Sequence, residues 1–229
     1  MNLFKQYRFY PKDEIERKAN DVLAIMEKEN FPPRWPFDAT RTADALEINV
    51  EWDKIPPDDE GAIAARILPL ERKIEINEDI LKLPKGFDQS TIAHEIGHWV
   101  LHVNQDEADG IVKQLGLNLG MEEAVKLFLC RSAGDKVNQI IGKSQLDNIE
   151  WQAQYFAGCL LMPRYKLEEE RRGRDLTRWS HLYAIQKDLG VTISNLTNRL
   201  QDLGWIYIPK GSKQIYPGDI APHGQTRIF

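Results

Sequence analysis

Cysteine is scarce in this sequence, and long apolar runs are absent. Its 229 residues contain 2 cysteines, Cys130 and Cys159, in separate apolar stretches with no C-x-x-C spacing. This usage predicts buried free thiols in a reducing compartment and argues against a disulfide framework or a cysteine metal site. No apolar run approaches the length of a membrane span, and the N-terminus shows no apolar signal-peptide core. We therefore expect a cytoplasmic protein.

A strong excess of one charge is also absent. The sequence has 30 Lys and Arg against 35 Asp and Glu, which gives a formal net charge of −5 with both signs mixed along the chain. This balance favours plain solubility and argues against an extended nucleic-acid-binding face. The composition is that of an ordinary globular protein, and the length allows a sizeable core without disulfides.

The hydrophobic periodicity predicts a mixture of helices and short strands. Helices are expected where apolar residues recur every three or four positions, and strands where β-branched residues alternate with polar ones. The predicted helices cover about residues 13–30, 43–48, 90–103, 149–163 and 182–203, the last with a turn at a glycine. The predicted strands cover residues 48–52, two segments joined by a charged turn within 63–77, and 205–209. Ser90 or Thr91 is the expected N-cap of the third helix.

One motif in that helix carries chemistry. His94-Glu95-Ile96-Gly97-His98 is an H-E-x-x-H sequence. Residues i and i+4 share a helical face, so both imidazoles can reach one metal ion. Zinc accepts such ligands and, with a third protein ligand, keeps a position open for water. Glu95 is then placed to take a proton from that water, which is the chemistry of a metal-dependent hydrolase.

The motif can also be interpreted as part of a purely structural helix, since such a short pattern arises by chance. Two features favour metal binding. The motif lies among apolar residues, and three of the five histidines of the chain fall within nine residues. A fortuitous motif predicts no bound metal at all.

The third ligand is not set by the motif. A metzincin site requires glycine and histidine where this sequence has Leu101 and Asn104. His102 follows His98 by one helical turn, too far along the helix to share the metal easily. We expect it to be packed or hydrogen-bonded instead.

An acidic residue from a later segment is the better candidate for this ligand. The candidates are Asp106, Glu107, Asp109, Glu122, Glu123, Asp135, Asp147 and Glu150. Glu150 stands out because small residues follow it (Ala153, Ala157 and Gly158), which lets another helix approach closely. Gln154, one turn later, is suited to hydrogen-bond a ligand histidine. Alternatively, Asp147 and Glu150 form a capping box at a helix start, and spacing alone does not decide between the two.

Two stretches together resemble a known family. The sequence TIAHEIGHWVLH, followed by IEWQAQYFAGCLLMP, resembles the ImmA/IrrE family of zinc metallopeptidases. Upstream, ERKIEIN occupies the place of the family's short edge strand, and downstream LGVTISNLTNRLQDLGWI resembles its closing segment. The resemblance spans about residues 13–208. In two places it is imperfect: Gln152 and Gln154 replace the usual Glu and Asn, and the gap at about 103–147 is longer than usual.

The resemblance implies a fold and a site. The fold is α+β and zincin-like, with a small mixed or antiparallel sheet beside the active-site helix and additional helices. Residues 1–208 form the metallopeptidase domain, with a helical insertion at about 103–147, and residues 209–229 form a C-terminal tail. One Zn²⁺ is bound by His94, His98 and Glu150, and Glu95 is the general acid and base. The oxyanion donor stays open among His181, Tyr155 and Tyr165.

The resemblance also implies a class of substrate. Its members act on helix-turn-helix transcriptional repressors, so we expect an endopeptidase with a specific protein substrate of that class. The alternative is a zinc-containing binding module, an antirepressor or toxin–antitoxin partner, that acts without cleavage. Residues 182–203 have helix-turn-helix spacing themselves, but only Asn195, Asn198 and Arg199 are suited to reading bases. We therefore expect this segment to pack against the core, and expect neither direct nucleic-acid binding nor a membrane partner.

Overall fold

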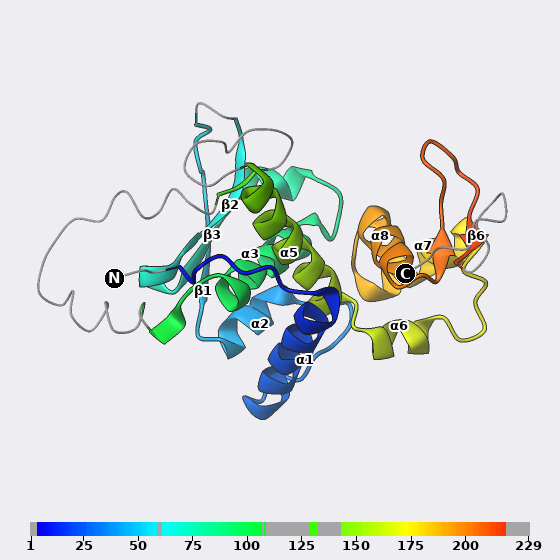
Figure 1. The fold of residues 1–229 in the computed structure, drawn as a ribbon, viewed down its shortest axis with the longest axis horizontal. Coiled ribbons are helices and arrows are strands. Elements are labelled where there is room, and N and C mark those ends of the chain that lie inside the picture. Colours follow the sequence, from blue (N-terminus) through cyan, green and yellow to red (C-terminus); the bar gives the residue numbers. More distant parts are fainter. Residues whose placement is uncertain (1–3, 59–60, 107, 109–128, 132–142, 219–229) are drawn as a thin grey trace, which may run out of the picture.

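A computed structural model describes residues 4–58, 61–106, 108, 129–131 and 143–218, which form a mixed α+β fold (Figure 1). This architecture is consistent with the predicted zincin-like class. The described helices are α1 (Lys12–Lys28), α2 (Ala39–Ala45), α3 (Phe87–Leu101), α5 (Lys143–Leu161), α6 (Arg164–Glu170), α7 (Trp179–Leu189) and α8 (Ile193–Asp202). The described strands are β1 (Asn49–Asp53), β2 (Ile63–Leu68), β3 (Lys73–Asn77), β4 (Leu129–Arg131), β5 (Ile206–Tyr207) and β6 (Tyr216–Pro217). None of the described helices is long and apolar enough to cross a membrane.

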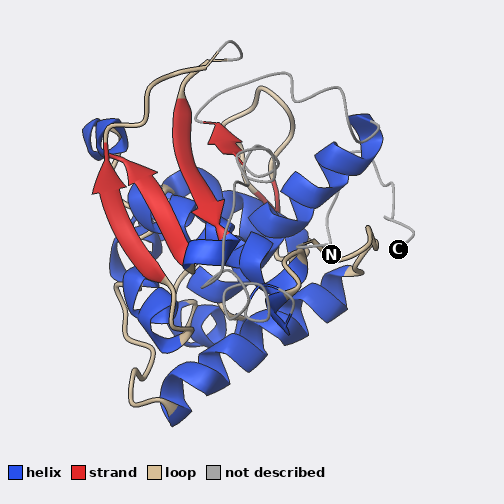
Figure 2. Cartoon of the chain, turned by 90° about the vertical axis from the view of Figure 1, so that its left-hand side faces the viewer, coloured by secondary structure: helices blue, strands red, loops and turns tan. Residues whose placement is uncertain are grey.

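The main sheet is mixed, in the order β1-β3-β2-β4 (Figure 2). β1 runs parallel to β3, whereas β2 is antiparallel to both β3 and β4. The prediction that residues 71–77 form an edge strand is wrong. β1 pairs with the far side of β3 from Asn49 opposite Lys73 to Asp53 opposite Asn77, so β3 lies inside the sheet.

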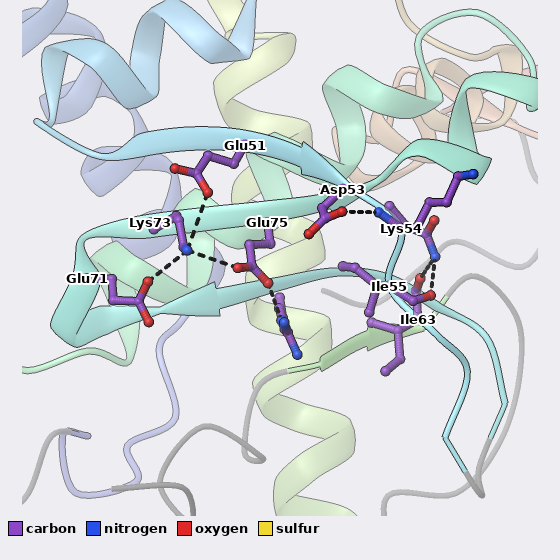
Figure 3. Close-up of polar contacts among 10 residues, drawn as sticks. Glu51, Asp53, Lys54, Ile55, Ile63, Glu71, Lys73 and Glu75 are labelled. Carbon is purple, nitrogen blue, oxygen red and sulfur yellow. Dashed lines mark hydrogen bonds and ion pairs between the residues drawn. The ribbon is translucent and has the colours of Figure 1, made fainter. Parts of the chain in front are cut away.

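Alternation along β3 separates the two faces of this sheet. Ile74 and Ile76 are fully buried in the core, on the face that the helices cover. Lys73 and Glu75 turn to the other face, because successive side chains of a strand point in opposite directions. There the Lys73 ammonium lies 2.7 Å from Glu71, 3.0 Å from Glu75 and 3.4 Å from Glu51 (Figure 3). A charged network therefore covers the outer face of the sheet.

Helix α3 is the central helix of the fold. It packs against β2 and β3 on one side and against α5 on the other, and α1 packs against α5 in turn. Ten of its residues, in the stretch from Thr91 to Leu101, are buried, as expected of a helix enclosed by neighbours. The H-E-x-x-H motif thus lies in the middle of the protein.

The start of α3 differs from the prediction. The helix begins at Phe87, after Gly86 in a left-handed conformation (φ 90°), and not at Ser90 or Thr91. The hydroxyls of those two residues donate to carbonyls one turn back, Ser90 to Gly86 and Thr91 to Phe87, each at 2.9 Å. Their side chains therefore bond within the helix instead of capping it.

The region predicted as a helical insertion is only partly described, and residues 109–128 and 132–142 lie outside the described part. Within it, residues 129–131 form β4 and extend the sheet, which a helical insertion does not predict. Helix α5 already begins at Lys143, six residues before the predicted start. α6, directly after Pro163, was not predicted.

The C-terminal helices form the expected helix–turn–helix, with Gly190 (φ 75°) ending α7. Arg199 on α8 is buried and donates to Glu16 of α1 at 2.9 Å, so it cannot read a base. After α8, β5 pairs with β6, and Ile215, directly before β6, is buried in the hydrophobic core. The domain limit at residue 208 stays a prediction, and residues 219–229 lie outside the described part.

Candidate metal centre

Helix α3 points two imidazoles at the same place. The Nε2 atoms of His94 and His98 lie 3.0 Å apart, and both side chains are buried. Two lone pairs at this distance repel unless a proton or a cation lies between them. The spacing of four residues therefore produces the shared face that the sequence predicted.

Helix α5 adds a carboxylate to this pair. One oxygen of Glu150 lies 3.1 Å from His94 Nε2, and the other lies 3.4 Å from His98 Nε2. Ligands at 2.0–2.1 Å from a tetrahedral zinc are separated by about 3.3–3.4 Å, which is close to these distances. Two neutral nitrogens and one carboxylate are also a donor set that suits zinc. The Glu150 side chain is 46% exposed, so the solvent side of the site is open.

The close approach of α3 and α5 depends on Gly97. A Cβ at this position would lie 2.9 Å from the carbonyl oxygen of Ala153 and 3.2 Å from the ring of Phe156. Ala153 is thus one of the small residues that permit the contact, as predicted. Gly158 is not, because a Cβ there would meet only Arg199, at 3.9 Å.

Glu150 lies in the second turn of α5, with its helix already formed from Lys143. The alternative that Asp147 and Glu150 form a capping box is therefore wrong. Among the other candidate ligands, Asp106 and Asp147 are described, and neither belongs to the group of converging atoms. The rest lie outside the described residues: Glu107, Asp109, Glu122, Glu123 and Asp135.

Within the triad, the histidines and Glu150 shift one another's pKa values. Burial alone would lower the pKa of His94, but the hydrogen bond and charge of Glu150 outweigh it and raise that pKa. For Glu150, burial acts to raise the pKa, and the two histidines overcome it and hold the pKa well below its usual range. Burial lowers the pKa of His98. The triad therefore combines an ionised carboxylate with two imidazoles, and binding of a cation requires both coordinating nitrogens to be free of protons.

Glu95 lies beside this triad and is completely buried. Neither of its carboxylate oxygens has a hydrogen-bond partner among the described residues. Burial, together with the charge of Glu150, raises the pKa of Glu95 to about 8. A carboxyl group with a pKa near neutrality can both accept and return a proton.

A cleft of about 980 Å³ opens at the triad. His94 and Glu150 lie in its wall, together with Trp151 and Gln154 of α5. The lining also includes residues that the sequence did not assign to the site, namely Lys85, Phe87, Gln186, Thr192, Ser194 and Asn195. No spacing rule marks these residues, because they come from a loop and three different helices.

None of the three oxyanion candidates is among the described residues that line this cleft. His181 accepts a hydrogen bond from the Asp175 backbone at 2.7 Å, and Tyr155 pairs with Arg199 at 3.3 Å. Tyr165 packs edge-on against Trp35, at 6.1 Å between ring centroids. These contacts place all three in structural roles in this conformation.

Gln154 of α5 lines the cleft with His94 and acts to raise its pKa, whereas the Nδ1 of His94 has no hydrogen-bond partner among the described residues. The hydrogen bond between Gln154 and a ligand histidine therefore stays a prediction. His102 is outside the converging group, and its Nδ1 lies 3.1 Å from Nδ1 of His98. Cys159 is a buried free thiol whose pKa burial raises to about 12, whereas the side chain of Cys130 lies outside the described part.

The geometry defines an α+β protein with a candidate His–His–Glu metal site of the metallopeptidase type. A family model described as IrrE N-terminal-like domain (Peptidase_M78) matches residues 125–201. This match supports the assignment of the chain to the ImmA/IrrE family. It contains Glu150 and α5 to α8, whereas the two histidines lie upstream of it.

This chain is also similar in part to a solved structure. A solved structure titled Mycobacterium tuberculosis transcriptional regulator has 14% sequence identity and a TM-score of 0.48. The alignment covers 84% of this chain and 52% of that protein, so the chain spans about half its length. No curated protein matches this chain.

Proposed function

We propose that this protein is a zinc-dependent endopeptidase that cleaves a specific protein substrate. The observation that carries the proposal is the convergence of His94 Nε2, His98 Nε2 and the Glu150 carboxylate beside a buried, unpaired Glu95. A pure metal-binding site needs only the first three groups. The fourth is costly to bury, and proton transfer gives it a role.

The three metal ligands and Glu95 have separate roles in the proposed hydrolysis. A zinc ion at His94, His98 and Glu150 would polarise the scissile carbonyl and acidify the attacking water. Glu95 accepts a proton from that water as it attacks. The same carboxyl then returns the proton to the amine that leaves. In the metal-free protein its pKa is raised to about 8, and the charge of a bound zinc ion would lower that pKa, so that the carboxylate could accept a proton near neutral pH.

The cleft is suited to a polypeptide. Its lining combines the apolar side chains of Leu83, Phe87 and Trp151 with polar groups such as those of Gln154 and Asn195. Backbone amides need donors and acceptors of this kind. We propose a helix-turn-helix transcriptional repressor as the substrate, on the resemblance to the ImmA/IrrE family.

Glu95→Gln tests the chemistry directly. Both proteins are loaded with zinc and incubated with a proteome-derived peptide library and with repressors encoded beside the gene, and new termini are identified by mass spectrometry. The wild type is expected to generate new termini, and the variant to retain zinc and lose at least a hundredfold in rate. Equal cleavage by the two proteins would contradict the role of Glu95.

The same variant separates the enzyme from the binding module. A module that neutralises a repressor without cutting it keeps its function in Glu95→Gln, because metal binding does not require a general base. Release of a repressor from its DNA operator, measured by fluorescence anisotropy, is therefore expected to fail with the variant. Release at the wild-type rate without new termini would establish the non-cleaving alternative.

A further inference from the structure

We propose that His102 is a positioning residue for the metal centre and holds His98 in the tautomer and ring orientation that metal binding requires. The contact is a hydrogen bond between two imidazoles. This inference rests on the proposed metal site, in which His98 is a ligand. It gives a role to the third histidine of the cluster, which is not itself a ligand.

The geometry of His98 fixes which of its nitrogens faces the metal. Its Nε2 lies 3.0 Å from His94 Nε2 and 3.4 Å from a Glu150 oxygen, whereas its Nδ1 lies on the other side of the ring. There it meets Nδ1 of His102 at 3.1 Å, within hydrogen-bonding distance.

The ring nitrogen that carries the proton in His98 and in His102 follows from one requirement. A nitrogen that binds a metal carries no proton, so a neutral His98 carries its proton on Nδ1. The His98 Nδ1–H donates, and Nδ1 of His102 accepts. His102 must therefore be neutral, with its proton on Nε2, since an imidazolium would offer a second donor.

The fold holds His102 from the backbone. Its N–H donates to the carbonyl of His98 at 2.8 Å, and its carbonyl accepts from the Lys5 N–H at 2.8 Å. The Lys5 ammonium also donates to the Val100 carbonyl at 3.0 Å. The last carbonyls of a helix lack partners within it, and here the N-terminal segment supplies them. The end of α3 that carries His102 is thus fixed in place.

Gln152 of α5 is completely buried next to His102 and acts to raise its pKa, although the Oε1 of Gln152 has no hydrogen-bond partner among the described residues. The Gln152 amide nitrogen donates to the backbone carbonyl of Arg8 at 3.4 Å. The hydrogen-bonded outer partner of the ligand His98 is therefore His102, at 3.1 Å. Outer partners of this kind typically change metal affinity 10- to 100-fold when they are removed.

Two variants at position 102 separate positioning from packing. In His102→Asn, the side-chain oxygen can take the place of Nδ1 and still accept from His98. His102→Leu has a similar size and no acceptor. Zinc affinity is measured by competition with a chelator, and the thermal unfolding of each zinc-free protein reports the structural cost separately. We expect the leucine variant to bind zinc about 10- to 100-fold more weakly and the asparagine variant to stay within about threefold of the wild type.

Two outcomes overturn the proposal while leaving the metal site intact. In one, the leucine variant binds zinc as tightly as the wild type. In the other, both variants lose affinity equally, in step with the loss of zinc-free stability. A wild-type protein that binds no zinc would instead remove the metal centre, and this inference with it.

A measurement on the wild type alone guards against a variant that does not fold. Nitrogen-15 NMR of the zinc-loaded protein reports the protonation of each ring nitrogen. His98 is expected with its proton on Nδ1, and His102 with its proton on Nε2 only. A protonated Nδ1 on His102 would contradict the hydrogen bond.

Discussion

Two glutamates of this protein are both nearly shielded from solvent and have opposite surroundings. Glu75, on the outer face of the sheet, has a side chain that is 11% exposed. Its carboxylate lies 3.0 Å from the Lys73 ammonium (Figure 3) and also forms an ion pair with Arg66. Glu95, on α3, is completely buried and has no hydrogen-bond partner among the described residues. The first carboxylate is paired with cations and the second is not.

The pKa values move accordingly. Burial alone would raise the pKa of Glu75, but Lys73 and Arg66 outweigh it and lower that pKa. At Glu95 burial outweighs the opposing charge of His94, and the pKa rises to about 8. On the sheet, the fold pairs the Glu75 carboxylate with cations, whereas the Glu95 carboxylate has no hydrogen-bond partner among the described residues. A buried carboxyl group of the second kind is a candidate for proton transfer.

The largest expected effect comes from removing the unpaired charge. In zinc-free protein at pH 8, Glu95→Gln is expected to raise the free energy of unfolding by about 4 kcal/mol. The folded pKa, about 8, lies above the ordinary value of 4.5, so the folded protein keeps a proton that the unfolded chain releases. Wild-type stability therefore falls as the pH rises from 4.5 to 8.

A pH series of denaturant unfolding checks this sign. The advantage of the glutamine variant should disappear near pH 4.5, where the wild-type carboxyl is protonated in both states. A variant that is less stable than the wild type at pH 8 would show that the Glu95 carboxylate is paired after all. The two glutamates would then not differ in their surroundings as described.

The paired glutamate should respond in the opposite direction. Glu75→Gln is expected to lower the free energy of unfolding at pH 7 by about 2 kcal/mol, because hydrogen bonds to charged partners are lost. The folded pKa lies below the ordinary value of 4.5, so this contribution is complete above pH 4.5 and fades as the pH falls below it. Thermal unfolding at pH 7 and pH 3 measures both.

An exposed ion pair provides the control for Glu75. Glu47, whose side chain is 83% exposed, lies 3.7 Å from Arg72. Glu47→Gln is expected to change stability by less than about 0.5 kcal/mol. Equal effects at positions 47 and 75 would mean that the network on the sheet contributes no more than an ordinary surface pair.

A third substitution moves the helices and leaves the charges in place. Gly97→Ala forces α3 and α5 apart, since the new Cβ would lie 2.9 Å from a backbone oxygen of Ala153. We expect a loss of about 1–3 kcal/mol in stability and weaker zinc binding. Gly158→Ala is the matched control, with no atom closer than 3.9 Å and an expected gain of about 0.5–1 kcal/mol. Equal zinc affinity in both variants would contradict the dependence of the site on this contact.

The local parts of the site could be predicted from the sequence. Helical periodicity alone places His94 and His98 on one face, because the geometry of a helix repeats within four residues. Glu150, 56 residues away from His94, could not be selected in this way. The small residues after it made it a candidate, and the family resemblance decided between a ligand and a capping box. The structure supplies the reason, which is the contact of Gly97 with Ala153.

The elements that the sequence missed share a physical cause. β3 has the alternation of any half-buried strand, and nothing within residues 71–77 reveals that β1 pairs with its far side. The start of α3 depends on Gly86 in a left-handed conformation, which no apolar pattern encodes. The wall of the cleft, including Thr192 and Asn195, forms only when α8 packs near α5. Each depends on contacts distant in the sequence.

Metal content is the most direct test of the central claim, that His94, His98 and Glu150 form a zinc site. Elemental analysis after zinc reconstitution and dialysis is performed on the wild type and on Glu150→Ala, with Asp147→Ala as a control on the same helix. About one zinc per chain is expected in the wild type and the control, with little or none in Glu150→Ala. A wild type without zinc, or a Glu150→Ala variant that retains it in full, would contradict the account.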